Sequence, residues 1–185
     1  MTGCTAHASG EPSKWVQRWS HLVAPGARVL DVACGSGRHL RWFAQHGNHV
    51  TGVDRDAAAL ELSRDCGAEL IHADIENGPW PLAPRRFDAV VVTNYLWRAL
   101  MPTIVASVDA GGVLIYETFA FGNERYGKPS NPDFLLRPGE LLALAEGLRV
   151  VAFEDGFAAA PDRCLQRIVA VRETGTAADP ARWRL

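Results

Sequence analysis

One stretch, residues 28–56, constrains the fold of this chain more than any other. It predicts a buried strand over 28–33, a tight glycine turn over 34–37, a helix over 38–46 and a second strand over 49–53. A strand, a helix and a strand in this order form a right-handed crossover, so the two strands lie parallel and adjacent. The turn after the first strand is therefore expected to open onto a ligand crevice at the carboxyl edge of the sheet.

The residues expected in that crevice favour an adenosine-like ligand with an ammonium group. Gly35 and Gly37 allow close approach of the backbone, and the carboxylate of Asp54 can accept both hydroxyls of a ribose. A dinucleotide fingerprint would place a third glycine at position 40, where Leu40 stands. Asp31 lies beside the turn, where it would repel a pyrophosphate and attract an ammonium group. A nicotinamide-dependent oxidoreductase is the alternative from another class of enzyme.

Five motifs occur in a characteristic order: VLDVACGSGRH, VTGVDRD, LIHADIEN, FDAVVVTNYL and GGVLIYETF. Over residues 28–118 the chain resembles the class I S-adenosylmethionine (SAM) dependent methyltransferases, and it is similar to the small methyltransferases related to tellurite-resistance enzymes. Ala33 stands where the family often has glycine. The resemblance implies SAM as cofactor and a Rossmann-like α/β fold: a seven-stranded, mostly parallel sheet with one antiparallel strand near the C-terminal edge and helices on both faces.

The resemblance and the positions of polar residues at strand ends together predict the cofactor site. For Asp74 the resemblance implies contact with the exocyclic amine of adenine, with a helix N-cap as the competing interpretation. Arg38 and His39 could hold the SAM carboxylate or an anionic acceptor. The predicted cofactor-binding residues are Asp31, Ala33, Cys34, Gly35, Gly37, Arg38, Asp54, Arg55, Ala73, Asp74, Ile75, Thr93 and Asn94.

The reaction is expected to be an in-line displacement, for which positioning of the acceptor supplies much of the acceleration. No His/Asp or Ser/His pair with telling spacing is present, so the catalytic candidates are Tyr95, Glu117 and His39. Strand alternation turns only one of Glu117 and its neighbour Tyr116 toward the crevice. The lack of an obvious base favours an acceptor such as a thiol or selenol, which ionises near neutral pH. His72 is expected to be a core histidine.

Composition predicts one cytoplasmic domain. The 185 residues carry a net charge of -2, and neither a membrane-spanning apolar run nor a leader is recognised. Without a CxxC pair, the four cysteines predict neither a metal site nor a disulfide framework. A small-molecule acceptor is expected, and nucleic acid or membrane partners are not. The alternative within the same class of enzyme is methylation of RNA or protein, which would be supported by one basic face made of Arg85, Arg86, Arg125, Lys128 and Arg137.

The rest of the chain fits around this unit, as a domain over 12–173 between a flexible N-terminus (1–11) and a tail (174–185). Trp15 and Trp19 lie on one face of a predicted helix and either pack it onto the sheet or cap the substrate cavity. The aromatic-bearing loop 119–137 is expected to be a lid or a binding loop. Further predicted helices span 12–22, 57–66, 96–108 and 138–145; further strands span 68–73, 87–93, 113–118, 148–154 and 165–172, and loops span 77–86 and 155–163.

Overall fold

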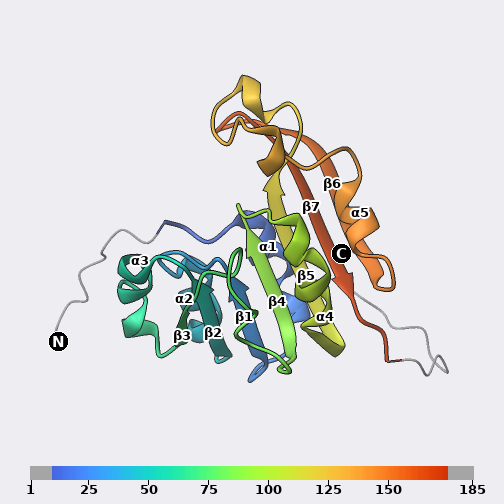
Figure 1. The fold of residues 1–185 in the computed structure, drawn as a ribbon. Coiled ribbons are helices and arrows are strands. Elements are labelled where there is room, and N and C mark those ends of the chain that lie inside the picture. The colour runs from blue at the N-terminus through green and yellow to red at the C-terminus, as the bar shows by residue number, and fades with distance from the viewer. Residues whose placement is uncertain (1–9, 175–185) are drawn as a thin grey trace.

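A single seven-stranded sheet, in the order β3-β2-β1-β4-β5-β7-β6, forms the centre of the computed structural model, which describes residues 10–174 (Figure 1). β7 runs antiparallel to both of its neighbours, and the other neighbouring pairs are parallel. This confirms the predicted Rossmann-like sheet. The strands are β1 (Arg28–Val32), β2 (His49–Asp54), β3 (Glu69–His72), β4 (Phe87–Thr93), β5 (Val108–Phe119), β6 (Arg149–Ala158) and β7 (Arg163–Val171).

Helices cover both faces of the sheet. Three helices pack on one face, where β1 and β4 contribute Val29 and Val91 to a buried apolar cluster. Two helices pack on the other face, where Leu30 and Val90 of the same strands belong to a second cluster. The central strands are therefore apolar on both sides, as expected for parallel strands covered twice. The helices are α1 (Lys14–Trp19), α2 (Arg38–Gln45) and α3 (Ala57–Glu61) on the first face, and α4 (Met101–Ala106) and α5 (Glu140–Leu144) on the second.

The connection from β3 to β4 contains no helix, as the proline-rich sequence of residues 77–86 predicts. Residues 73–86 form turns instead. Ile75 and Leu82 from this segment are buried and pack into the same cluster as α4 and α5. Two apolar anchors thus take the place of the usual crossover helix.

Several predicted boundaries are wrong. β5 begins at Val108 rather than at residue 113, because four residues, 109–112, bulge out between the pairings of Phe87 with Val108 and of Ala89 with Val113. The predicted loop 155–163 is largely strand, since β6 and β7 remain paired through Gly156 and Leu165. The helix predicted from residue 138 starts at Glu140, and the predicted helices over 12–22, 57–66 and 96–108 are shortened to α1, α3 and α4.

Two side-chain predictions have opposite outcomes. Trp15 and Trp19 are buried on the face of α1 that packs against the sheet, so the packing interpretation of these rings is confirmed. His72 was expected in the core but is exposed, and its Nε2 lies 3.0 Å from the carbonyl oxygen of Arg55. β3 is an edge strand, so its side chains are less covered than those of the central strands. A polar residue within its largely apolar sequence can therefore be exposed.

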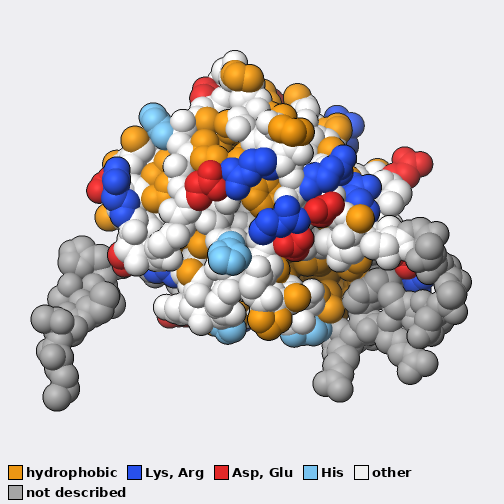
Figure 2. Space-filling model, turned by 90° about the horizontal axis from the view of Figure 1, so that it is seen from below, with side chains coloured by type: hydrophobic (Ala, Val, Ile, Leu, Met, Phe, Trp, Pro, Cys, Tyr) orange, Lys and Arg blue, Asp and Glu red, His pale blue; other side chains and the backbone are white. Residues whose placement is uncertain are grey.

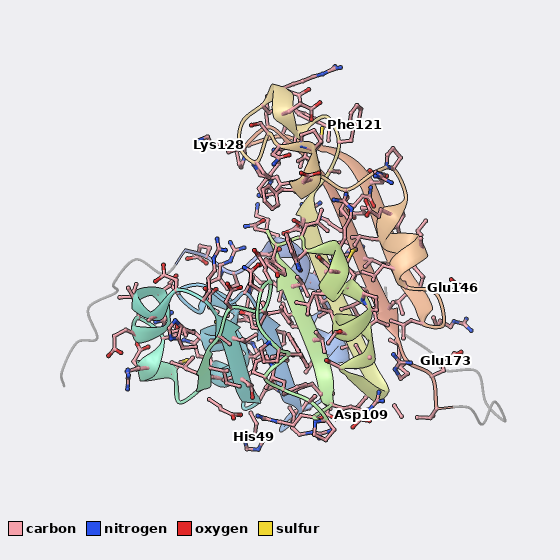
Figure 3. All side chains as sticks on the ribbon, in the orientation of Figure 1. His49, Asp109, Phe121, Lys128, Glu146 and Glu173 are labelled. Atoms are coloured by element: carbon pink, nitrogen blue, oxygen red, sulfur yellow. The ribbon has the colours of Figure 1, made fainter. Side chains whose placement is uncertain are left out.

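The segment 119–137 forms a lobe above the carboxyl edge of the sheet, visible at the top of Figure 1. Figure 3 shows Phe121 and Lys128 on this lobe, with His49 and Asp109 at the opposite edge. Asn123 anchors the lobe: its side chain donates to the carbonyl oxygen of Pro129 (3.1 Å) and accepts from the N–H of Cys164 (3.2 Å). Most of the predicted flexible N-terminus, 1–11, and of the tail, 174–185, lies outside the described residues.

Candidate active site

The turn after β1 has the backbone geometry that its small residues predict. Ala33, Gly35 and Gly37 all have positive φ angles, of 53°, 52° and 74°. A Cβ added to Gly35 would meet no atom within 4 Å, whereas one added to Gly37 would lie 2.8 Å from the Cβ of Ser63. Gly35 therefore faces open space that a ligand can fill, and Gly37 allows close packing of the protein itself. Ala33 adopts a conformation that costs an L-residue about 1–2 kcal/mol, which explains why glycine suits this position.

Asp54 lies at the end of β2, next to the turn. Its Oδ2 accepts a hydrogen bond from the N–H of Gly35 (2.7 Å), and its Oδ1 accepts one from the N–H of Asp56 (2.9 Å). A carboxylate has about four acceptor positions, so each oxygen can accept one more hydrogen bond. Asp54 thus holds the turn in place and still has the capacity to bind a diol.

A cavity of about 150 Å³ connects the ends of β1, β2 and β4. It brings together several of the predicted cofactor residues with the catalytic candidate Tyr95. It also includes Glu76, which the sequence did not indicate and which lies 3.4 Å from the guanidinium of Arg55. The lining residues are Ala33, Asp54, Arg55, Asp74, Ile75, Glu76 and Tyr95.

Asp74 caps a short turn rather than a helix. Its Oδ1 accepts from the N–H groups of Glu76 (3.0 Å) and Asn77 (3.2 Å), and its Oδ2 accepts from the side-chain amide of Asn77 (2.9 Å). These hydrogen bonds, with that of the Asn77 side chain foremost, lower the pKa of Asp74 below its usual value. Both oxygens are therefore partly used within the protein, although the carboxylate still lines the cavity.

Tyr95 presents an unsatisfied polar atom to this region. Its hydroxyl is buried and has no hydrogen-bond partner among the described residues. Burial, helped by the nearby Glu76, raises the pKa of the Tyr95 phenol above its usual value. The group therefore remains a protonated phenol at neutral pH and is suited to donate a hydrogen bond rather than to remove a proton.

Asp31 and Arg38 lie on the other side of the turn. The side chain of Asp31 is only 2% exposed, its Oδ2 has no hydrogen-bond partner, and the nearest cationic candidate is Nδ1 of His39 at 3.7 Å. The guanidinium of Arg38 donates to the hydroxyl of Thr93 (3.2 Å) and to the carbonyl oxygen of Glu11 (3.4 Å), and no carboxylate within residues 10–174 pairs with it. A carboxylate with an unpartnered oxygen and a guanidinium without a carboxylate partner among the described residues thus lie near one end of the crevice.

Glu117 and Tyr116 point to opposite faces of β5, and each of their side-chain oxygens already makes a hydrogen bond within the protein. Oε1 of Glu117 accepts from the hydroxyl of Ser13 (2.7 Å), and Oε2 accepts from Nε of Arg167. Tyr116 is fully buried and donates its hydroxyl proton to the carbonyl oxygen of Tyr95 (2.9 Å). Ser13 and Arg167 were not indicated by the sequence; the only signal at Ser13 is that of a helix N-cap, which it is.

The remaining predicted residues lie around the same turn and strand ends. Cys34 is buried within the turn, and the N–H of Ala73 donates to the carbonyl oxygen of Asp54 (3.0 Å). Asn94 is exposed and follows β4 with a positive φ of 54°, a conformation that asparagine tolerates. The structure therefore places all the predicted cofactor residues at one edge of the sheet.

The donor set fits SAM. Asp31 offers an unpartnered acceptor for an ammonium group, Asp54 has acceptor capacity for ribose hydroxyls, and the open space above Gly35 admits a ligand next to the backbone. Arg38 offers an unpaired guanidinium for a carboxylate. These four features lie near the end of β1, in the turn that follows it, at the start of α2 and at the end of β2.

The five arginines and lysines proposed for an RNA-binding face do not gather on one face. Arg85 pairs with Glu69 (2.7 Å), and Arg86 donates to the carbonyl oxygen of Ala106 (2.7 Å), both near the amino end of β4. Figure 2 shows the molecule from that side, where Lys and Arg side chains lie beside Asp and Glu. Lys128 lies on the lobe at the opposite edge (Figure 3).

Comparison with known proteins identifies a methyltransferase domain in this chain. The family model described as a methyltransferase domain matches residues 29–112. The tRNA U34 carboxymethyltransferase of Shewanella woodyi is 33% identical over 166 residues, which cover 77% of this chain and 48% of that protein. The malonyl-[acyl-carrier protein] O-methyltransferase of Serratia marcescens is 31% identical over 107 residues, which cover 54% and 41% of the two chains. This chain therefore spans less than half the length of these two relatives.

Among solved structures, TehB from Haemophilus influenzae has a similar fold, with a TM-score of 0.68 and 18% identity over 85% of this chain and 61% of that one. The methyltransferase domain matched over residues 29–112, the methyltransferase relatives and the shared fold support a class I SAM-dependent methyltransferase. SAM is the cofactor that this class implies. Separately, the described helices are too short or too polar for any of them to span a bilayer.

Proposed function

We propose that this chain transfers the methyl group of SAM to a small-molecule acceptor. The observation that carries the proposal is the buried carboxylate of Asp31, which has an unpartnered oxygen beside a turn whose other side is held by Asp54. Burial of an unpartnered carboxylate carries a free-energy cost of desolvation, and a ligand ammonium group would offset that cost. The negative charge of a diphosphate would increase it.

In the proposed binding mode, each part of SAM lies against the end of a different strand. Asp54 accepts hydrogen bonds from the ribose hydroxyls, and Ala73, Asp74 and Ile75 border the adenine. At the amino-acid end, Asp31 binds the ammonium group and Arg38 binds the carboxylate. This assignment pairs the ammonium and the carboxylate of the ligand each with a side chain of opposite charge that has no ion-pair partner of full charge among the described residues.

When bound, SAM supplies an electrophilic methyl group on a sulfonium. The residues of this chain then have to hold the acceptor in line and exclude water. None of the three catalytic candidates is an unengaged base: Glu117 is buried and ion-paired with Arg167, Nε2 of His39 already accepts a hydrogen bond, and Tyr95 is a protonated phenol. This supports an acceptor that ionises without help, such as a thiol or a selenol.

Methylation of RNA is the second candidate, because one relative that matches 77% of this chain is named a tRNA carboxymethyltransferase. The division of the five basic residues between two edges of the sheet speaks against it. Binding of a tRNA mixture that weakens steeply with salt, together with methyl transfer to it, would favour RNA over a small acceptor.

Calorimetric titration with S-adenosylhomocysteine tests the cofactor, with NADH as the control ligand. We expect binding of S-adenosylhomocysteine and none of NADH; the reverse result would overturn the proposal. Transfer from methyl-labelled SAM to thiols, oxyanions of selenium and tellurium, amines and carboxylates then tests the acceptor. A labelled thiol or selenol product supports the acceptor class, whereas labelled RNA alone would replace it.

A further inference from the structure

The protonation state of His39 follows from the contacts of its ring. The backbone N–H of Ser13 donates to Nε2 of His39 at 3.1 Å, and both residues are buried. An imidazolium carries a proton on each nitrogen and cannot accept this hydrogen bond. The ring is therefore a neutral imidazole with its proton on Nδ1, the nitrogen that faces Oδ2 of Asp31 at 3.7 Å.

This tautomer has a consequence for Asp31. A protonated histidine at that distance would neutralise the carboxylate and remove its attraction for a cation. A neutral imidazole instead presents a polar N–H to Oδ2, beyond hydrogen-bonding distance at 3.7 Å, and leaves the charge of the carboxylate intact. The Asp31 carboxylate thus has no cationic partner among residues 10–174.

Ser13 is held in place by contacts that do not involve His39. Its hydroxyl donates to Oε1 of Glu117 (2.7 Å) and accepts from the N–H of Trp15 (3.1 Å) as the N-cap of α1. Glu117 is in turn paired with Arg167, which also pairs with Glu154 (3.0 Å). The position of the Ser13 N–H is therefore fixed by residues of β5 and β7.

We infer that Ser13 and His39 are positioning residues that act through Asp31: the Ser13 N–H keeps the His39 imidazole neutral, so that Asp31 has a polar but uncharged neighbour and stays free for the ammonium group of the cofactor. The inference rests on the proposed function. It also gives Glu117, a candidate base, the different role of holding Ser13.

A pair of ligands isolates this effect. S-adenosylhomocysteine is compared with the analogue in which hydrogen replaces its amino group, so that adenosine and carboxylate contacts are common to both. In the wild type we expect the amine to improve the dissociation constant about tenfold or more, as for a hydrogen bond between charged groups. His39→Phe should reduce this ratio to less than threefold, with binding of the deaminated analogue little changed.

Two further variants separate positioning from structural damage. His39→Gln supplies a neutral amide with an N–H for Asp31 and an oxygen for the Ser13 N–H, so we expect it to restore most of the ratio. Ser13→Pro removes the N–H and should lower the ratio as His39→Phe does. Ser13→Ala keeps the N–H while losing the bond to Glu117, so both affinities can fall but their ratio should persist.

The outcomes are distinct. An unchanged ratio in His39→Phe, or an equal loss of both affinities, would overturn the inference. If that variant does not fold, the Ser13→Pro and Ser13→Ala pair decides the question by the same ratio. If the wild-type protein binds neither ligand, it is the proposed function that fails.

Discussion

Oδ2 of Asp54 accepts a hydrogen bond from the N–H of Gly35 at 2.7 Å, so the end of β2 fixes the turn that follows β1. The two residues are 19 positions apart, and they meet because the crossover places β1 and β2 side by side with Val32 opposite Val53. One carboxylate therefore serves both the fold and the proposed ribose site.

Replacement of Asp54 tests this double role. Asp54→Ala should weaken S-adenosylhomocysteine binding by about 2 kcal/mol, roughly 30-fold, through loss of hydrogen bonds to the ribose and a less ordered turn. Asp54→Asn keeps one acceptor oxygen for the turn and should lose less. Calorimetry of both variants tests whether Asp54→Ala loses more affinity than Asp54→Asn. An unchanged dissociation constant in Asp54→Ala would show that the residue does not belong to the site.

The two glycines of the turn should respond differently to the same substitution. Gly37→Ala places a Cβ 2.8 Å from the Cβ of Ser63 at a positive φ, so we expect a loss of roughly 2–4 kcal/mol in the free energy of unfolding. Gly35→Ala meets open space and should cost about 1–2 kcal/mol for its φ alone.

Ligand binding provides the contrast for this pair. Gly35→Ala fills the space proposed for the cofactor, so it should lose S-adenosylhomocysteine binding while it remains folded. Denaturant unfolding and calorimetry measure the two effects. Equal stability losses, or full binding by Gly35→Ala, would contradict the assignment of Gly35 to the ligand and Gly37 to packing.

The sequence predicted the sheet and the turn because both depend on local patterns. Strands of apolar residues, a glycine turn with Gly35 and Gly37, and acids at strand ends are visible within about 30 residues, and parallel topology then brings the strand ends to one edge. The length of the hairpin formed by β6 and β7 was underestimated, because Asp155 and Gly156 suggest a turn. In the structure these two residues still pair with Gln166 and Leu165.

The hydrogen bonds that connect Ser13 with His39 and with Glu117 could not be predicted from the sequence. Ser13 lies 26 residues from His39 and 104 from Glu117, and nothing local marks a contact over such separations. The capping preference of serine indicates where α1 begins but not what else its hydroxyl and N–H meet. The sequence made Glu117 a candidate base, but in the structure it forms an ion pair with Arg167 of β7.

Tyr95→Phe should separate stability from function. The hydroxyl of Tyr95 is buried without a partner, so its removal should leave the free energy of unfolding unchanged or raise it by about 1 kcal/mol. If the unpartnered phenol donates a hydrogen bond to the ligand, as its place in the cavity lining leads us to expect, affinity for S-adenosylhomocysteine or turnover should fall. Thermal unfolding without ligand and calorimetry with it test this; a marked loss of stability would show that the hydroxyl has a structural partner.

Arg98 holds the segment that leads from the lobe to α5. It donates to both oxygens of Glu140 (2.7 and 3.0 Å) and to the carbonyl oxygens of Asp133 (2.6 Å) and Leu135 (2.8 Å). Burial alone would raise the pKa of Glu140, but the hydrogen bonds from Arg98 and from the N–H of Arg137 lower it overall. Arg98→Met should therefore cost about 2 kcal/mol at pH 7 by breaking several of these bonds.

The sign of the pH dependence follows from the lowered pKa of Glu140. A carboxyl group whose pKa is depressed on folding stabilises the native state above its usual value of 4.5, and the contribution disappears as pH falls through the folded-state pKa. Wild-type stability should therefore fall more steeply below pH 4.5 than that of Arg98→Met. Arg64→Met, which breaks only an exposed pair with Glu61, is the matched control and should change stability by less than about 1 kcal/mol at any pH. Parallel pH profiles for the wild type and Arg98→Met would show that Arg98 does not control the ionisation of Glu140.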